Sequence, residues 1–377
     1  MKSSQKRNEP DSPKLLYIHM CALGDAIMAS PALRILKEGL PHARVCVLAR
    51  SHVQKYFRTL PYVDEVVPFI DERHVDRMKP LRLLGRVEDV FRLIKQLRTG
   101  GYEAAIQWRG QLPDTLMSVC TGARHRVAGV QSIHRRARFP VERLSFLVTD
   151  LVPVTDRGAH LVEAMAAPAR FLVEKLGGKL PANPNLSLDY PLQAADHVAA
   201  AEFMNAHGLQ GGEPFALVCI SARSAVNTWP DDRWSAIADH LQSRQRVRVV
   251  LTGLPDHQAR ETAIVAMMRT KPICSIARIP FGVECALLAR SRLLVSLNTG
   301  ISHIAAALQV PVVVLSGNEG ASITPWGTCH YVVTRNSFYP QRHPDRRQWR
   351  TLVPLITVED VTKAIDSILS ESYVNRG

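Results

Sequence analysis

The stretch SRLLVSLNTGISHIAAALQVPVVVLSG, residues 291–317, predicts a strand, a helix and a second strand in close succession. Its two apolar runs, 293–297 and 310–315, are short enough to be buried strands. Between them, residues 300–308 predict a helix whose three consecutive alanines can lie close against a sheet. This segment therefore indicates an α/β fold.

Asn298, Thr299 and Gly300 stand where the first of these strands ends and the helix begins. Free backbone N–H groups and the positive end of the helix dipole meet at such a junction, which makes it a natural seat for a phosphate. The alternative is that Asn298 or Thr299 only caps the helix and His303 only packs. On this segment alone, capping is the simpler interpretation.

Strands and helices alternate along the rest of the chain, which predicts doubly wound parallel sheets. In the first half, the expected strands are residues 14–20, 44–49, 65–69 and 102–108, and the expected helices are 25–39, 52–60, 87–98 and 159–176. A further helix–strand pair is expected after residue 108, ending at about Val130. In the second half, the strands are 215–221, 246–253, 273–277 and 331–334, and the helices are 231–242, 256–269, 283–290 and 358–369.

The segment GGKLPANPNLSLDYPL, residues 177–192, interrupts the alternation and is rich in Gly, Pro and Asn, as inter-domain linkers are. We expect a disordered basic tail over 1–13, a Rossmann-like domain over 14–178 and a linker over 179–192. A second Rossmann-like domain should cover 193–356, and a C-terminal helix over 357–377 could pack back on the first domain. The expected architecture is two doubly wound domains facing a central cleft.

Composition describes a basic globular protein, with 377 residues, 46% hydrophobic residues and a net charge of +13. Its seven cysteines are scattered without a CxxC pair, which argues against disulfides and a zinc site and favours the cytoplasm. Basic clusters lie at 135–143 and 342–350, but no nucleic-acid-binding motif accompanies them. The charge suits an anionic membrane surface, with reversible docking on the inner face of a bacterial inner membrane, or an anionic lipid-linked glycan acceptor. A solvated arginine-rich surface is the simpler alternative.

Several motifs, in this order, resemble glycosyltransferase family 9, which contains the lipopolysaccharide heptosyltransferases. In the first half they are LGDAIMASPALRILKEGLPHARVCVLAR (23–50), VDEVV (63–67) and LIKQLRTGGYEAAI (93–106). In the second half they are WPDDRW (229–234), LTG (251–253), NTGISHIAAAL (298–308) and PVVVLSG (311–317). The resemblance implies a GT-B fold and an inverting, metal-independent transfer of a sugar from a nucleotide-sugar, with no cofactor.

The resemblance also assigns roles to residues. It implies that Asp25 is the general base for the acceptor hydroxyl, with Gly24 and His19 in the acceptor-side loop. From the residues alone, Asp25 would be an ordinary helix cap and Gly24 would permit a tight turn. The resemblance places the donor pyrophosphate against Thr299, Gly300 and His303, next to Asn298. Further donor-binding candidates are Ser221, Arg223, Ser224 and Asn227 for phosphate, and Asp256, His257 and Ile279 for the nucleoside.

The chain departs from the family pattern at four places. It has Asn298 where the family usually has Asp, Asn227 where a Lys precedes the Trp-Pro, Pro255-Asp256-His257 where a Glu follows the strand, and His19 where an Arg is frequent. These departures leave the reaction class standing and the donor sugar open, with ADP-heptose as the expectation. Two alternatives to an active transferase are a catalytically silent relative that binds a nucleotide, a glycan or a partner protein, and an epimerase of GT-B shape. For the epimerase, no paired carboxylates are evident.

Overall fold

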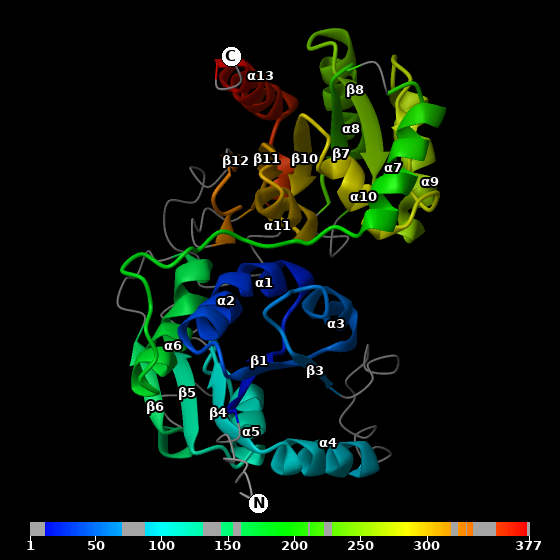
Figure 1. The fold of residues 1–377 in the computed structure, drawn as a ribbon. Coiled ribbons are helices and arrows are strands. Elements are labelled where there is room, and N and C mark those ends of the chain that lie inside the picture. Colours follow the sequence, from blue (N-terminus) through cyan, green and yellow to red (C-terminus); the bar gives the residue numbers. More distant parts are fainter. Residues whose placement is uncertain are drawn as a thin grey trace, which may run out of the picture. The chain divides into compact units, whose positions relative to one another are not determined.

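Two six-stranded sheets, in which all paired strands run parallel, form the framework of the structure (Figure 1). The computed structural model describes residues 12–69, 87–130, 145–153, 160–209, 212–221, 228–317, 323–328, 330–334 and 352–374. By its internal contacts the chain divides into two units, Met1–Asp189 and Tyr190–Gly377, and each is described by itself. Most of the predicted linker thus belongs to the first unit.

The first unit contains strands β1 (Lys14–His19), β2 (Arg44–Ala49), β3 (Glu65–Pro68), β4 (Tyr102–Gln107), β5 (His125–Val130) and β6 (Asp150–Pro153). Its helices are α1 (Leu23–Met28), α2 (Ser30–Gly39), α3 (Ser51–Phe57), α4 (Val87–Thr99), α5 (Leu112–Cys120) and α6 (Leu161–Lys175). Side chains alternate across β1, so Leu16 and Ile18 join Leu93 and Leu97 of α4 in one apolar core. Helices α2 and α6 pack together on the other face.

The second unit contains β7 (Phe215–Cys219), β8 (Arg248–Thr252), β9 (Ile273–Cys274), β10 (Leu293–Leu297), β11 (Val312–Leu315) and β12 (His330–Val333). Its helices are α7 (Ala194–Ala206), α8 (Asp231–Ser243), α9 (Gln258–Met267), α10 (Phe281–Leu288), α11 (Gly300–Ala307) and α13 (Val358–Val374), with short 3₁₀ turns η7 (Pro255–His257) and η10 (Val353–Leu355). The sequence pattern predicted neither α7 nor β6.

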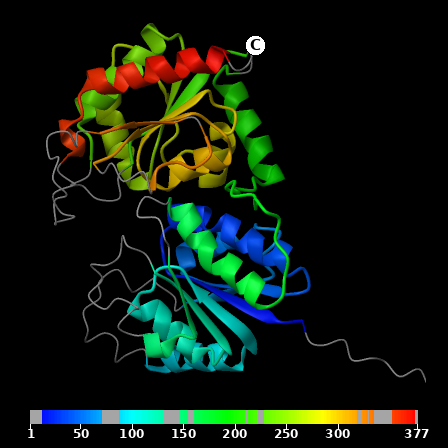
Figure 2. The same ribbon diagram turned by 90° about the vertical axis from the view of Figure 1, so that its left-hand side faces the viewer.

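Helix α13 belongs to the core of the second unit, where Figure 2 shows it in red. Its Val361, Ile365 and Ile368 are fully buried there, whereas the sequence allowed this helix to pack on the first domain. Trp229 and Trp234, from the Trp-Pro motif, lie in the same core with ring centroids 5.1 Å apart. The Trp229 indole N–H donates to the Ile356 carbonyl at 2.9 Å, so this motif ties the start of α8 to the segment before α13.

The order of the strands indicates where each sheet can bind a ligand. The two orders are β3-β2-β1-β4-β5-β6 and β12-β11-β10-β7-β8-β9, which is the same pattern in both units. In each sheet the chain first builds outward in one direction and then returns to build in the other. The reversal falls between β1 and β4 in the first unit and between β7 and β10 in the second. Open α/β sheets bind ligands outside the carboxyl ends of their strands at this switch point.

The predicted single helix over residues 25–39 is wrong in one respect, because the structure breaks it at Ala29 between α1 and α2. Pro31 has no N–H to donate to the carbonyl of Ile27, four residues earlier. The hydroxyl of Ser30 donates to that carbonyl instead, at 2.7 Å. The break lets α1 stand as a separate short helix directly after β1.

Candidate functional site

The first candidate site lies at the switch point of the first unit, where the segments that follow β1 and β4 are neighbours. Asp25 is the third residue of α1 and is partly exposed. Its carboxylate accepts the backbone N–H of Ala22 at 3.3 Å. The N-cap residue is Ala22, so Asp25 supports the helix start from within the first turn and is not the N-cap that the alternative expected. Gly24 lies inside α1 and is not among the glycines with positive φ, so the expectation of a tight glycine turn is wrong.

His19, the last residue of β1, is fully buried and packs edge-on against Phe57 at 5.1 Å. Among the described residues, neither of its ring nitrogens has a hydrogen-bond partner of good geometry. Burial lowers the pKa of His19 to about 3; Arg109 and His52 act in the same direction, and the backbone of Ala22 opposes them. His19 is therefore neutral at physiological pH and supplies shape to this site, not charge.

Arg109 and Asp114 are two residues of this site that the sequence patterns did not single out. Arg109 follows β4, and Asp114 lies in the first turn of α5. The guanidinium donates from Nε to Asp114 Oδ2 at 2.7 Å and from Nη2 to Oδ1 at 2.8 Å. The strand order is the signal that would have found them, because it puts the segment after β4 next to the segment that carries Asp25.

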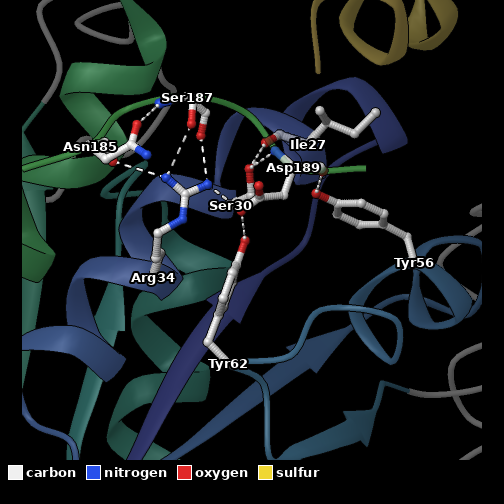
Figure 3. Close-up of polar contacts among 8 residues, drawn as sticks. All are labelled: Ile27, Ser30, Arg34, Tyr56, Tyr62, Asn185, Ser187 and Asp189. Atoms are coloured by element: carbon white, nitrogen blue, oxygen red, sulfur yellow. Dashed lines mark hydrogen bonds and ion pairs between the residues drawn. The ribbon is translucent and has the colours of Figure 1, made fainter. Parts of the chain in front are cut away.

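A partly buried polar cluster holds the end of the first unit against α2 (Figure 3). Arg34 forms an ion pair with Asp189 and donates to the backbone carbonyls of Asn185, at 3.1 Å, and Ser187, at 2.8 Å. The Tyr62 hydroxyl donates to the Asp189 carboxylate at 2.6 Å. The cluster thus fixes the last residues before the second unit, and we call it the Arg34–Asp189 clamp.

The second candidate site lies at the switch point of the other unit, around the carboxyl ends of β7, β8 and β10. There the structure brings together two predicted donor-binding residues, Ser221 and His257. The Ser221 hydroxyl lies 3.2 Å from His257 Nδ1 and accepts the backbone N–H of Leu254 at 2.7 Å. Gly253 leaves the room for this contact, since a Cβ there would lie 2.9 Å from Ser221 Oγ.

The junction of β10 and α11 keeps its helix N-terminus without a side-chain cap. Thr299 is the N-cap residue, but its hydroxyl donates back to the Leu297 carbonyl at 3.3 Å. The Asn298 side-chain amide donates to the Ile323 carbonyl at 3.3 Å. The expectation that Asn298 or Thr299 caps the helix is therefore wrong. Gly300 opens α11, and His303 lies buried one turn further on.

The other predicted donor residues fall in different surroundings. Asp256 is exposed in η7. Ile279 is partly buried and packs against the apolar cluster between α7 and α10, which gives it a structural role in addition. Arg223, Ser224 and Asn227 lie outside the described residues, as do the basic clusters at 135–143 and 342–350.

A buried carboxyl group sits beside the second site. Glu284 of α10 accepts a hydrogen bond from the hydroxyl of Thr252, the last residue of β8. Burial raises the pKa of Glu284 to about 7, and the Thr252 hydroxyl works against that rise. No pattern in the sequence distinguished Glu284 from an exposed helical glutamate.

The described ranges hold neither a metal-ligand cluster nor a membrane-spanning helix. In that part of the chain no group of three or more His, Cys, Asp or Glu side chains is placed to hold a metal ion. None of the helices described there is both long and apolar enough to cross a membrane.

Comparison with known proteins gives three concordant results. The sequence profile described as glycosyltransferase family 9 (heptosyltransferase) matches residues 90–348. Lipopolysaccharide heptosyltransferase 3 of Escherichia coli K12 is 26% identical over 354 residues, covering 92% of this chain and 96% of that protein. The solved glycosyl transferase of family 9 from Veillonella parvula superimposes with a TM-score of 0.73 at 19% identity, covering 96% of this chain and 99% of the other.

A further solved structure, E. coli heptosyltransferase WaaC with ADP-2-deoxy-2-fluoro heptose, gives a TM-score of 0.62 at 18% identity and covers 94% of this chain and 99% of the other. The two parallel six-stranded sheets thus have the GT-B fold of these enzymes.

Proposed function

Because the chain belongs to glycosyltransferase family 9, the heptosyltransferase family, we propose that this glycosyltransferase moves a heptose-like sugar from ADP-heptose to a hydroxyl of lipopolysaccharide core or another surface glycan. The proposal rests on the chemical groups that lie at the two switch points. One holds a carboxylate on a short helix, and the other an uncapped helix N-terminus beside a serine–histidine contact.

Asp25 is the proposed general base. It would take the proton of the acceptor hydroxyl while that oxygen bonds to the anomeric carbon and ADP departs with the electrons of the broken bond, so that the anomeric configuration inverts. Partial exposure supports this role, because the carboxylate must reach the acceptor. The contact to Ala22 uses one oxygen of the carboxylate and fixes its direction.

The proposed donor site is the carboxyl edge of β7, β8 and β10. The N–H groups that open α11, with the positive end of its dipole, can stabilise the charge that develops on the pyrophosphate. Asn298, Thr299, Gly300 and His303 would lie on this side. Asp256, His257 and Ile279 would lie on the nucleoside side, and Ser221, Arg223, Ser224 and Asn227 would contact phosphate. Helix dipoles and arginines can do this work without a metal or other cofactor.

We further propose that the protein works in the cytoplasm and docks reversibly on anionic membrane. The net charge of +13 supports this, and Arg135, Arg136 and Arg138 are the proposed contacts. Each basic residue at such a surface contributes about 1 kcal/mol, screened by salt. Co-sedimentation with anionic vesicles should fall as salt rises, and equal binding to neutral vesicles would contradict the proposal.

The test of the transferase function pairs donor binding with turnover. ADP and ADP-heptose should raise the melting temperature, whereas UDP and GDP should raise it less. Transfer is then measured by mass spectrometry of a lipopolysaccharide core that lacks its outermost heptose. Donor binding without transfer or donor hydrolysis would favour a catalytically silent relative, and no nucleotide binding would reject the proposal.

A further inference from the structure

We propose that Arg109, held by Asp114, is a positioning residue whose charge favours the ionised form of the Asp25 carboxylate without pairing with it. The inference rests on the proposed role of Asp25 as the base. It adds a residue to which none of the sequence motifs pointed, and it explains why a buried ion pair is built at this edge of the sheet.

Placement is the first argument. Strands β1 and β4 are adjacent and parallel, with Ile18 beside Gln107, so the segments that leave their carboxyl ends are neighbours. Asp25 lies six residues beyond His19, where β1 ends, and Arg109 lies two residues beyond Gln107, where β4 ends. Arg109 interacts electrostatically with Asp25 as well as with Asp114.

The geometry of the Arg109–Asp114 pair is the second argument. The Asp114 side chain is 2% exposed and the Arg109 side chain 16% exposed, so the pair is largely withdrawn from water. Two parallel N–H···O bonds fix the plane of the guanidinium. Its third nitrogen, Nη1, donates to no group within the part of the chain that the structure describes.

The bidentate hydrogen bonding between Arg109 and Asp114 has a consequence for Asp25. An arginine free to rotate would form its own bidentate pair with Asp25 and occupy the oxygens that the acceptor hydroxyl needs. Asp114 instead accepts both of these hydrogen bonds, so Arg109 acts on Asp25 through its charge alone. A nearby positive charge favours the ionised form of a carboxyl group, so the base is charged before the acceptor arrives.

Several other titratable groups near α1 do not supply this charge. Burial raises the pKa of the Cys21 thiol, and burial lowers that of His19, so both are neutral. Arg34 of α2 is paired with Asp189. At the start of α6, which also contacts α1, the Glu163 carboxylate accepts the backbone N–H of His160, and the His160 ring accepts the backbone N–H of Val162.

Arg50 and His52 lie at the start of α3, which also packs against α1. Arg50 also acts on Cys21. These two groups are unchanged throughout the variants below, so any effect of Arg109 is measured against their constant background.

The experiment follows the Asp25 carboxyl directly, by carboxyl-carbon NMR of protein labelled at aspartate, with the Asp25 signal identified by its loss in Asp25→Asn. In Arg109→Met the Asp25 titration should move up by about 1 pH unit. Arg109→Lys should restore most of the shift, because it keeps the charge. Asp114→Asn should move the titration down, because the freed guanidinium then pairs with Asp25. Lys37→Met removes a cation on α2 that is paired with Asp64, and it should leave the Asp25 titration unchanged.

The acid limb of kcat/KM for transfer from ADP-heptose should follow the same shifts. An Asp25 titration that is unchanged in Arg109→Met would overturn the inference, as would a raised KM for the acceptor with an unmoved titration, which would make Arg109 an acceptor-binding residue. Transfer that survives in Asp25→Asn would instead reject the proposed base. The two failures are therefore distinguishable.

Discussion

The hydroxyl of Ser30 accepts the backbone N–H of Asp189 at 3.0 Å while it donates to the Ile27 carbonyl at 2.7 Å. One side chain therefore joins the end of α1 to the last residue of the first unit. Ser30 can do so because Pro31 leaves the Ile27 carbonyl without its helical partner. The helix that carries Asp25 is thus fixed at its C-terminal end by the Arg34–Asp189 clamp.

We expect Asp25→Asn to reduce kcat by 10²- to 10⁴-fold, the usual range for loss of a general base. The amide oxygen can still accept the Ala22 N–H, so the helix start should be preserved. ADP affinity by calorimetry and the melting temperature should stay close to wild type. A large fall in melting temperature would mean that Asp25 is mainly a cap.

Removal of the clamp carboxylate should destabilise the first unit. Asp189→Ala leaves the Arg34 guanidinium, whose side chain is 11% exposed, without its ion-pair partner. We expect a loss of about 2 kcal/mol in the free energy of unfolding by urea denaturation, and about 1 kcal/mol for Tyr62→Phe, which loses one hydrogen bond. Glu359→Ala, which breaks the exposed pair with Lys363, is the control and should have no measurable effect. Equal effects of Asp189→Ala and Glu359→Ala would contradict the role of the clamp.

Glu284 should make stability depend on pH. Its pKa is raised by burial from 4.5 to about 7 in the folded protein. The folded state therefore holds more protons than the unfolded state over that window, and stability falls as pH rises through it. Glu284→Gln should remove this loss and stabilise the protein by about 2 kcal/mol at about pH 8, with little change at about pH 4. Glu202→Gln, at an exposed position on α7, should leave the pH profile of the melting temperature unchanged.

Gly253→Ala should weaken ADP binding about tenfold, because its Cβ would lie 2.9 Å from Ser221 Oγ and 3.0 Å from Ile276 Cδ1. Ser221→Ala should weaken binding as well, since it removes the contact with His257. In the double variant Gly253→Ala/Ser221→Ala, the alanine at position 221 relieves part of the clash. The loss of ADP-binding free energy in the double variant should therefore be smaller than the sum of the losses in the two single variants. Additive losses would show that Gly253 and Ser221 act independently.

Much of the fold was predictable because buried parallel strands are short apolar runs, as in β1, β7 and β10. The misses have specific causes. The helix break at Ala29 had a signal in Pro31, which the apolar pattern over 25–39 outweighed. Strand β6 was missed because it consists only of DLVP, a run too short to distinguish from a loop by its sequence.

The candidate sites were predictable only in part. Ser221 and His257 were named from their positions after strands, and the structure brings them into contact. Arg109 and Asp114 belong to no recognisable sequence motif. They lie near Asp25 only because β1 is beside β4, and the order of the strands cannot be read from local sequence. Glu284 is distinguished by burial alone, and burial of a single helical glutamate cannot be derived from local sequence.

The Arg34–Asp189 clamp determines where the chain can be divided into separately expressed fragments. A fragment that stops at residue 178, the boundary suggested by composition, would discard Asn185, Ser187 and Asp189 and leave the Arg34 guanidinium facing solvent without its acceptors. A fragment that stops after Asp189 would carry the whole clamp. Anyone who expresses the two halves separately, or exchanges them between relatives, should place the junction at the Asp189–Tyr190 bond.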